Sequence, residues 1–107
     1  QKLVISVLSY IENHYREGGL TELANSLHYD VHWLSREISS RTGKTYTELI
    51  QAKRLGQAAY LLSTTGLSVA EVSEAVGYDN ISYFHRIFQK KYGMTPRKYR
   101  LGEKEAK

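Results

Sequence analysis

The side chains best suited to chemistry are two arginines, Arg36 and Arg86, and the polar residues around them. A guanidinium can donate two hydrogen bonds to guanine O6 and N7, and serine, histidine or glutamine can contact base edges or phosphates. Apolar residues at three- and four-residue steps turn one face of each expected helix inward, which leaves these polar residues on the outward face. The outward residues are His32, Ser35, Arg36 and Ser39 in one stretch, and Ser82, His85, Arg86 and Gln89 in another.

Other kinds of chemistry find little support in the sequence. Paired carboxylates, a phosphate-binding P-loop and a glycine-rich dinucleotide fingerprint are all missing. The chain has no cysteine, which excludes disulfides, thiolate metal ligands and cysteine nucleophiles. The four histidines fall on different expected elements without metal-ligand spacing: His14, His28, His32 and His85. We therefore expect no enzyme activity, no metal and no cofactor.

Charge is unevenly distributed along the 107 residues. Residues 1–50 contain five Lys or Arg and six Asp or Glu, a net charge of −1, whereas residues 51–107 contain ten and five, a net charge of +5. This distribution suits a polyanionic partner for the second half. No apolar run approaches the ~20 residues of a membrane-spanning helix, and no signal peptide is visible. We therefore expect the protein to be cytoplasmic and not to associate with a membrane.

The positions of apolar, glycine and capping residues predict an all-α chain of about seven helices. Two capping boxes, Thr45 to Glu48 and Ser68 to Glu71, mark helix starts, and Asp30 can cap a third helix. Thr95 and Pro96 suit the cap and first position of the last helix. The expected helices cover about residues 3–15, 20–27, 31–42, 45–64, 68–76, 81–92 and 96–101, and the charged residues 102–107 are expected to fray.

The helical periodicity also predicts which side chains are buried. In the two stretches that carry the arginines, the inward residues are expected to be Leu34 and Ile38, and Ile81, Phe84 and Phe88. Trp33 and Tyr83 flank the polar faces and are expected to pack at their rim or in the core. Tyr78 and Tyr99 are expected to be core residues with a polar edge. Lys53 and Arg54, on the helix of residues 45–64, are expected to be solvated.

The chain repeats itself. Leu23, Leu27, Tyr29, Asp30, Leu34, Arg36, Ile38, Gly43 and Thr45 correspond to Val72, Val76, Tyr78, Asp79, Phe84, Arg86, Phe88, Gly93 and Thr95. The offset is 49 residues up to a turn and 50 after it, so one residue is inserted in the second turn. Each copy has a short helix, a tight turn, a helix and a glycine, which is the plan of a helix-turn-helix. His28 stands where the second turn has Gly77, so we expect a side chain at a position that favours glycine.

The second copy resembles a known family. A VGY turn at residues 76–78, an SYFxRxF pattern at residues 82–88 and a GxTPxxYR pattern at residues 93–100 resemble the signature of AraC/XylS regulators. The resemblance extends over about residues 1–100. It implies the DNA-binding domain of a bacterial transcription regulator, with two helix-turn-helix units bridged by a linker helix. It also implies a separate effector-sensing or receiver domain, to which nothing in this chain corresponds.

The resemblance further implies which residues touch DNA. It places base-reading positions at His32, Ser35, Arg36, Ser82 and Arg86, and His85 shares the face of the last two. We expect Arg36 and Arg86 to be the main base readers. Contacts to the DNA backbone are expected from Ser39, Gln89, Lys90, Lys91, Arg97 and Lys98, and from the helix start at Thr95. The first unit carries Asp30 and Glu37 with few bases, so we expect a smaller share of the affinity from it.

This interpretation divides the chain into a first helix-turn-helix subdomain of residues 1–44, a linker helix of residues 45–64, a second subdomain of residues 65–101 and a tail of residues 102–107. From about residue 45 to residue 63, a span of 19 residues, the linker helix would extend roughly 28 Å at ~1.5 Å per residue, and successive major grooves on one side of DNA lie ~34 Å apart. We therefore expect one chain to read an asymmetric site, with DNA bending if the linker is rigid.

Two points stay open at this stage. Helix-turn-helix units can serve as protein-docking modules instead, and the acidic first half would suit such a role. RNA polymerase is a candidate partner of the first unit, because activators of this type can touch it. The chain begins with Gln1 and not Met, so we expect a fragment of a longer bacterial regulator that associates with the nucleoid when it binds DNA.

Overall fold

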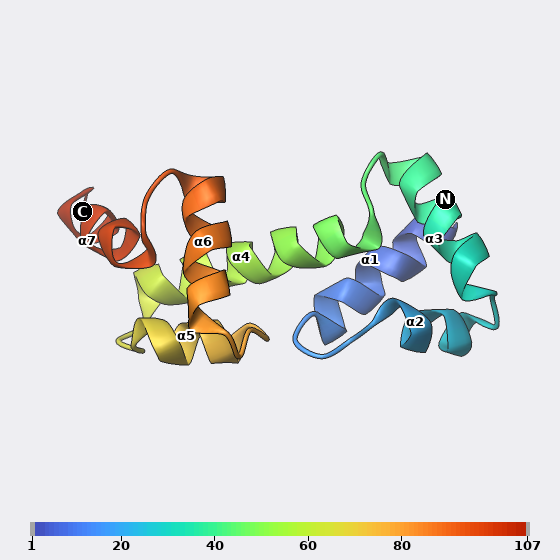
Figure 1. Cartoon of the computed structure of the whole chain (residues 1–107), viewed down its shortest axis with the longest axis horizontal. Coiled ribbons are helices and arrows are strands. Elements are labelled where there is room, and N and C mark those ends of the chain that lie inside the picture. The colour runs from blue at the N-terminus through green and yellow to red at the C-terminus, as the bar shows by residue number, and fades with distance from the viewer. Residues whose placement is uncertain (1, 107) are drawn as a thin grey trace. The chain divides into compact units, whose positions relative to one another are not determined.

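The computed structural model describes the backbone of residues 2–106 and the side chains of residues 2–102. Within that range all regular secondary structure is helical, which confirms the predicted all-α class (Figure 1). The seven helices of the described range are α1 (Lys2–His14), α2 (Leu20–Leu27), α3 (Val31–Thr42), α4 (Tyr46–Thr64), α5 (Val69–Ala75), α6 (Ile81–Tyr92) and α7 (Pro96–Ala106).

The chain divides into two compact units, residues 1–53 and residues 54–107. The boundary falls inside α4, so the first half of this helix belongs to one unit and the second half to the other. Tyr46 and Ile50 accordingly join the core of the first unit, whereas Leu55 and Leu62 are buried in the second. The segment expected to be a separate linker is therefore a structural part of both units.

The first unit is built from α1, α2, α3 and the start of α4. Its helices bury one apolar face each, and the Tyr46 hydroxyl donates a hydrogen bond of 3.2 Å to the Gly18 carbonyl, which ties α4 to the loop after α1. The buried residues are Val7, Ile11, Leu23, Ala24, Leu34, Ile38, Tyr46 and Ile50. This core packs α3 against α2. It thereby fixes which face of α3, the second helix of the helix-turn-helix, is exposed to solvent.

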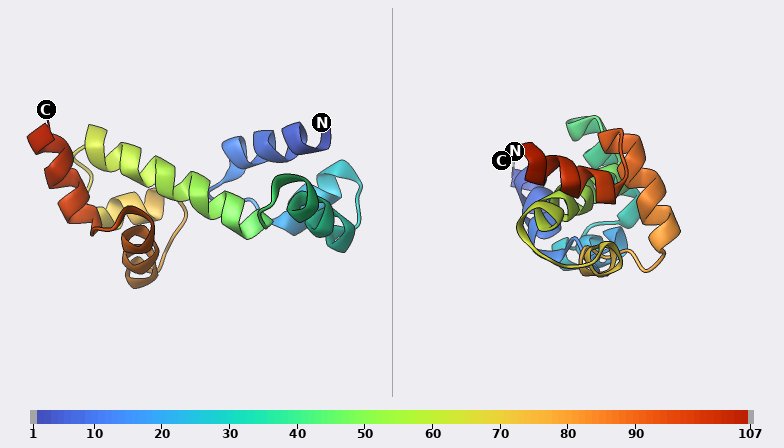
Figure 2. Two further views of the ribbon diagram at one scale, coloured as in Figure 1. Left: turned by 90° about the horizontal axis from the view of Figure 1, so that it is seen from above. Right: turned by 90° about the vertical axis from the view of Figure 1, so that its left-hand side faces the viewer.

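The second unit has an aromatic core. Phe88 is fully buried, with its ring centroid 5.7 Å from that of Phe84, 4.5 Å from Tyr92 and 5.5 Å from Tyr99. These rings join α6 to α7 at separations typical of favourable aromatic pairs. Figure 1 shows α6 standing across α5, and the view from above in Figure 2 shows α6 nearly end-on at the same crossing. The aromatic cluster therefore sets the direction of α6 within its unit.

Local hydrogen bonds begin the helices at the predicted residues. The Asp30 carboxylate accepts from the Trp33 N–H at 2.9 Å and caps α3, while Ser68 and Glu71 form the expected capping box at α5. Thr45 and Glu48 form the other box, with hydrogen bonds of 2.8 and 3.0 Å. A side chain that satisfies the N–H groups at the start of a helix favours helix formation at that residue.

The turn between α2 and α3 contains the expected departure from glycine. His28 has φ 60° and ψ 39°, the left-handed region, and no other non-glycine residue between residues 2 and 106 has a positive φ. Gly77, at the matching place in the second unit, has φ 104°. The two turns thus both have a residue with positive φ at this position, although only the second turn uses glycine there.

Two expectations about helices were wrong in detail. Ile81 is 40% exposed, whereas Ile87, which the periodicity did not select, is 9% exposed and joins the core. Ile81 is the first residue of α6, and because side chains on a helix tilt toward its N-terminus, the Ile81 side chain is directed beyond the end of the helix. The last helix, expected to end near residue 101, continues to Ala106, because the residues after Gly102 are good helix formers. The fraying expected of residues 102–107 stays a prediction. Lys107 lies outside the described residues.

The capping box of α5 should make stability depend on acid pH. The Ser68 N–H and hydroxyl, which hydrogen-bond the Glu71 carboxylate, lower the pKa of this group. A carboxyl whose pKa is depressed by folding stabilises the native state above its unfolded pKa of about 4.3, and this stabilisation is lost as the pH falls through the folded pKa. Glu71→Gln keeps the hydrogen-bonding shape without the titration. We expect its melting temperature to fall less than that of the wild type between about pH 6 and about pH 3, as followed by circular dichroism.

The matched control is Glu74→Gln, which removes a carboxylate from the same helix without touching the capping box. It should retain the acid sensitivity of the wild type. Equal acid sensitivity of Glu71→Gln and the wild type would contradict the assignment.

Candidate nucleic-acid interface

Helix α3 presents a polar face to solvent. Leu34 and Ile38 are buried at its inner side, with exposed fractions of 0% and 2%. The predicted base-reading residues His32, Ser35 and Arg36 are exposed, and Ser39 is half-buried. The pKa of the Asp30 carboxyl, which caps the start of the helix, is lowered first by the Trp33 N–H and to a lesser degree by the His32 N–H and the nearby Arg36 charge.

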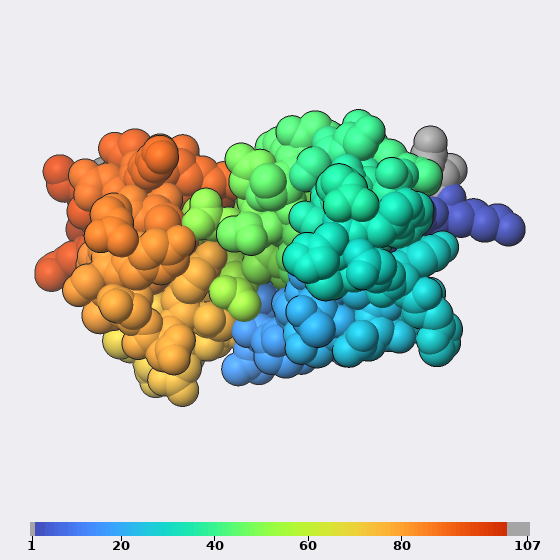
Figure 3. Space-filling view, turned by 45° about the vertical axis from the view of Figure 1, so that its right-hand side comes forward, coloured from blue at the N-terminus to red at the C-terminus, as the bar shows by residue number. Residues whose placement is uncertain are grey.

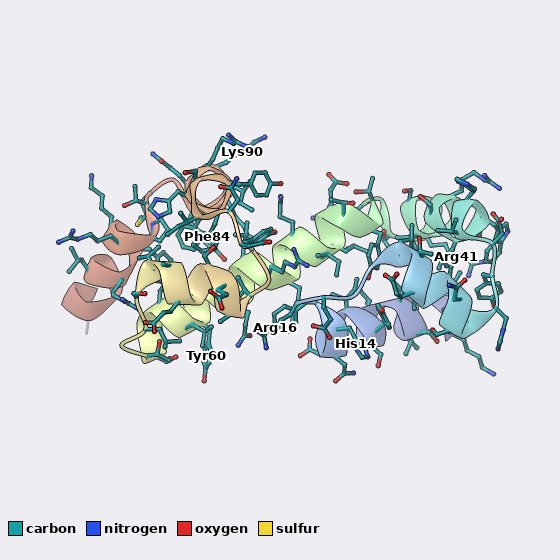
Figure 4. All side chains as sticks on the ribbon, turned by 60° about the horizontal axis from the view of Figure 1, so that its bottom comes forward. His14, Arg16, Arg41, Tyr60, Phe84 and Lys90 are labelled. Atoms are coloured by element: carbon teal, nitrogen blue, oxygen red, sulfur yellow. The ribbon has the colours of Figure 1, made fainter. Side chains whose placement is uncertain are left out.

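Helix α6 has the same organisation. Phe84, Ile87 and Phe88 face the core, and Asn80 caps the helix by accepting a hydrogen bond of 3.0 Å from the Tyr83 N–H. In Figure 3 the residues of α6, in orange, lie on the visible surface of their unit. Figure 4 shows Phe84 directed into that unit and Lys90 directed away from it. The exposed polar residues of this helix are Ser82, His85, Arg86, Gln89, Lys90 and Lys91.

The two polar faces differ in their electrostatics. On α3, the Arg41 guanidinium forms an ion pair of 2.9 Å with Glu37, so part of the positive charge of this helix is neutralised within the helix. Helix α6 contains no acidic residue and carries Lys90 and Lys91 in its last turn. Arg97 and Lys98 add exposed positive charge at the start of α7, where Thr95 caps Lys98 N–H at 3.2 Å. The second unit therefore offers the stronger attraction for a polyanion.

Comparison with known proteins identifies the family of this chain. A model described as a helix-turn-helix domain matches residues 23–102. The xylose operon regulatory protein of Escherichia coli strain K12 is 33% identical over 98 residues, which are 91% of this chain and 25% of that protein. The chain belongs to the AraC/XylS family of transcription regulators. It spans about a quarter of the length of this relative.

Solved structures of AraC/XylS-type domains have the same fold. The C-terminal domain of AraT, a response regulator from Geobacillus stearothermophilus, is 33% identical with a TM-score of 0.88, and the match covers 95% of this chain and 86% of that one. A transcriptional regulator with an AraC-type DNA-binding domain from Chromobacterium violaceum is 21% identical with a TM-score of 0.89, over 96% and 93% of the two chains. The two-unit helical architecture is thus that of the AraC/XylS fold.

Arg100, the last residue of the AraC/XylS pattern quoted above, has a structural position that the sequence did not reveal. Its guanidinium donates to the Leu62 carbonyl at 2.9 Å and to the Thr65 carbonyl at 3.3 Å. These carbonyls lie at the C-terminal end of α4 and just beyond it, where backbone acceptors lack intrahelical partners. Arg100 therefore caps α4 from α7. No local pattern could indicate this contact, because the partners are 38 and 35 residues away.

Lys53 and Arg54 are not simply solvated, contrary to expectation. Lys53 Nζ lies 2.6 Å from a Glu12 carboxylate oxygen and 5.7 Å from the Tyr15 ring centroid, all within the first unit. Arg54 lies with its Cζ 4.9 Å from the Tyr78 ring centroid, within the second unit. Both side chains are half-buried. Each therefore anchors one half of α4 in its own unit.

Among the residues that the structure describes, the tests for a metal site and for a membrane span add no second candidate site to this AraC/XylS-type domain. No group of three His, Cys, Asp or Glu residues within the described range is arranged to hold a metal ion. None of the helices described is both long and apolar enough to span a membrane. The polar faces of α3 and α6 thus remain the candidate functional surface.

Proposed function

We propose that this chain binds double-stranded DNA in a sequence-specific manner, with α3 and α6 as reading helices. The observation that carries the proposal is the duplication. Each unit presents an exposed arginine, Arg36 or Arg86, at the same place on the second helix of its helix-turn-helix. A helix fits the major groove, where a guanidinium can distinguish guanine by its two acceptors. A surface without a reading role would not need the same residue twice.

The neighbours of each arginine complete the proposed reading face. His32 and Ser35 on α3, and Ser82 and His85 on α6, are exposed beside Arg36 and Arg86 respectively. Hydroxyl and imidazole groups donate and accept hydrogen bonds, so they suit base edges as well as phosphates. We assign these four residues, together with the two arginines, to base reading.

Contacts to the DNA backbone are assigned mainly to the second unit. Lys90, Lys91, Arg97 and Lys98 are exposed, and such cations bind phosphates without regard to sequence. Gln89 is exposed on α6, Ser39 lies at the edge of the α3 face, and Thr95 begins α7 beside the two cations of its first turn. This uneven distribution means that the second unit supplies most of the affinity.

The activity of a longer parent protein is part of the same proposal. The relative from Escherichia coli is a regulatory protein of an operon and is longer than this chain. We propose that this chain is the DNA-binding part of a bacterial transcription regulator in the cytoplasm, which has a separate sensing or receiver domain. RNA polymerase is the proposed second partner of such a regulator, through the first unit.

Selection from a random pool of DNA duplexes tests the function directly. The chain is mixed with the pool at moderate salt, and the retained duplexes are sequenced. We expect two enriched blocks about one helical turn apart, one for each reading helix. The matched control carries Arg36→Ala and Arg86→Ala together and should lose the base preference at one position in each block, the position that faces the arginine. One block in place of two would assign specificity to the second unit and positioning to the first.

Two results would contradict the proposal. Binding without enrichment that disappears as salt rises would show non-specific electrostatic association. Absence of binding even at low salt would favour a protein-docking module, for which the exposed arginines would serve a protein partner.

A further inference from the structure

The guanidinium of Arg86 lies over an aromatic ring of its own helix. Its Cζ lies 5.3 Å from the ring centroid of Tyr83, three residues earlier on α6. Residues three apart on a helix are neighbours on its surface, so this contact is built into the backbone. Tyr83 is 37% exposed, and the contact therefore lies at the surface, beside the reading face of α6.

The Tyr83 ring also packs against a second tyrosine, Tyr78. Its centroid lies 5.8 Å from that of Tyr78, with the two planes at 63°, an edge-to-face arrangement. Tyr78 comes from the turn before α6. The Arg54 guanidinium of α4 lies over its ring, with Cζ 4.9 Å from the ring centroid. The stack runs from α4 through the turn to α6 and lies entirely within the second unit. A ring supported in this way limits the positions that Arg86 can take.

The first unit repeats the aromatic pair. Tyr29 and Trp33 stand where the second unit has Tyr78 and Tyr83, and their ring centroids are 4.7 Å apart. Arg36 follows Trp33 by three residues, as Arg86 follows Tyr83. The chain thus places an aromatic pair before the arginine in both helix-turn-helix units, and an accidental neighbour of Arg86 would not be expected to have such a counterpart.

We propose that Tyr83 is a positioning residue for base reading: its ring holds the Arg86 guanidinium so that less side-chain freedom is lost when Arg86 meets a base. This inference rests on the proposed function, because it assigns a role in the same reading face. A planar guanidinium stacks well on an aromatic ring, and pre-organisation of a flexible side chain increases affinity by lowering the cost of ordering it. Cation–π contacts at exposed sites correspond to a factor of about two to five in an equilibrium constant.

Binding to duplexes tests the proposal. Dissociation constants are measured for the preferred duplex and for duplexes with one base pair changed, using the full chain. Tyr83→Leu should reduce discrimination about two- to five-fold at the base pair that Arg86 reads, and leave other positions and binding to a non-specific duplex unchanged. Tyr83→Phe retains the ring and should behave like the wild type. In the Arg86→Ala background, Tyr83→Leu should have no further effect.

The outcomes separate the inference from the function on which it rests. Unchanged discrimination in Tyr83→Leu, or an equal loss with and without Arg86, would overturn the positioning role while the base-reading role of Arg86 stands. A loss in Tyr83→Phe equal to that in Tyr83→Leu would assign the effect to the hydroxyl and also overturn it. If Arg86→Ala alone changes no base preference, the base-reading role of Arg86 fails, and the inference with it.

A folding defect is controlled by a second variant. Circular dichroism first establishes that Tyr83→Leu is folded. Tyr83→Met removes the ring with an unbranched side chain that favours helix, and the same reduction in discrimination is expected from it. Wild-type discrimination in this variant would overturn the proposal.

Discussion

Replacing Phe88 with alanine is expected to destabilise the second unit by about 3–5 kcal/mol, because it removes a fully buried ring and leaves a cavity. The ring lies against three other aromatic side chains, those of Phe84, Tyr92 and Tyr99, so the loss includes aromatic contacts as well as apolar burial. Whole domains are stable by only about 5–15 kcal/mol. The second unit, residues 54–106, should therefore be unfolded in a large fraction of the molecules at moderate temperature. DNA binding through α6 should be lost in those molecules.

Chemical denaturation followed by circular dichroism measures this effect. The matched control is Ile81→Ala, on the same helix but at a side chain that is 40% exposed, for which a loss below about 1 kcal/mol is expected. This pair also tests the correction made above, since helical periodicity alone would place Ile81 and Phe88 in the same core. Losses of similar size in the two variants would contradict the packing described.

The sequence predicted the helices because their starts and ends depend on nearby residues. Asp30, Ser68 and Thr95 bind N–H groups three residues ahead, and Gly43 and Gly93 end helices with φ near 75°. These effects are local and carry a recognisable spacing. The exposed faces that carry the two arginines could also be predicted from local spacing, because the buried residues on the opposite side of each helix recur at helical steps. Their role in reading bases stays a prediction.

Contacts between distant residues could not be predicted in this way. The partners of Lys53 and Arg54 lie 41 and 24 residues away, in helices or turns whose packing a pattern does not give. Arg100 caps α4 from the far end of its unit for a similar reason. The contact between Arg86 and Tyr83 is different, because the two residues are three apart and share a helical face. Its signal was present in the sequence, but packing at the rim explained an aromatic residue there equally well.

Arg86→Ala is expected to relax base preference at a single position of the binding site and to cost about 1–3 kcal/mol of specific binding. The guanidinium is exposed on the face of α6 opposite Phe84 and Phe88, where a groove-bound helix would meet base edges. Arg36→Ala should relax a different position by the same mechanism.

Lys90→Ala is the control that separates base reading from charge. Lys90 is exposed in the last turn of α6 and points away from its unit, so its loss should weaken binding to all duplexes alike and reduce the salt dependence by about one unit of slope. Dissociation constants at several salt concentrations, for the preferred duplex and single-base variants, distinguish the two behaviours. If Arg86→Ala instead weakened every duplex equally, Arg86 would be a phosphate contact, and base specificity would have to come from Ser82 and His85 on the same face.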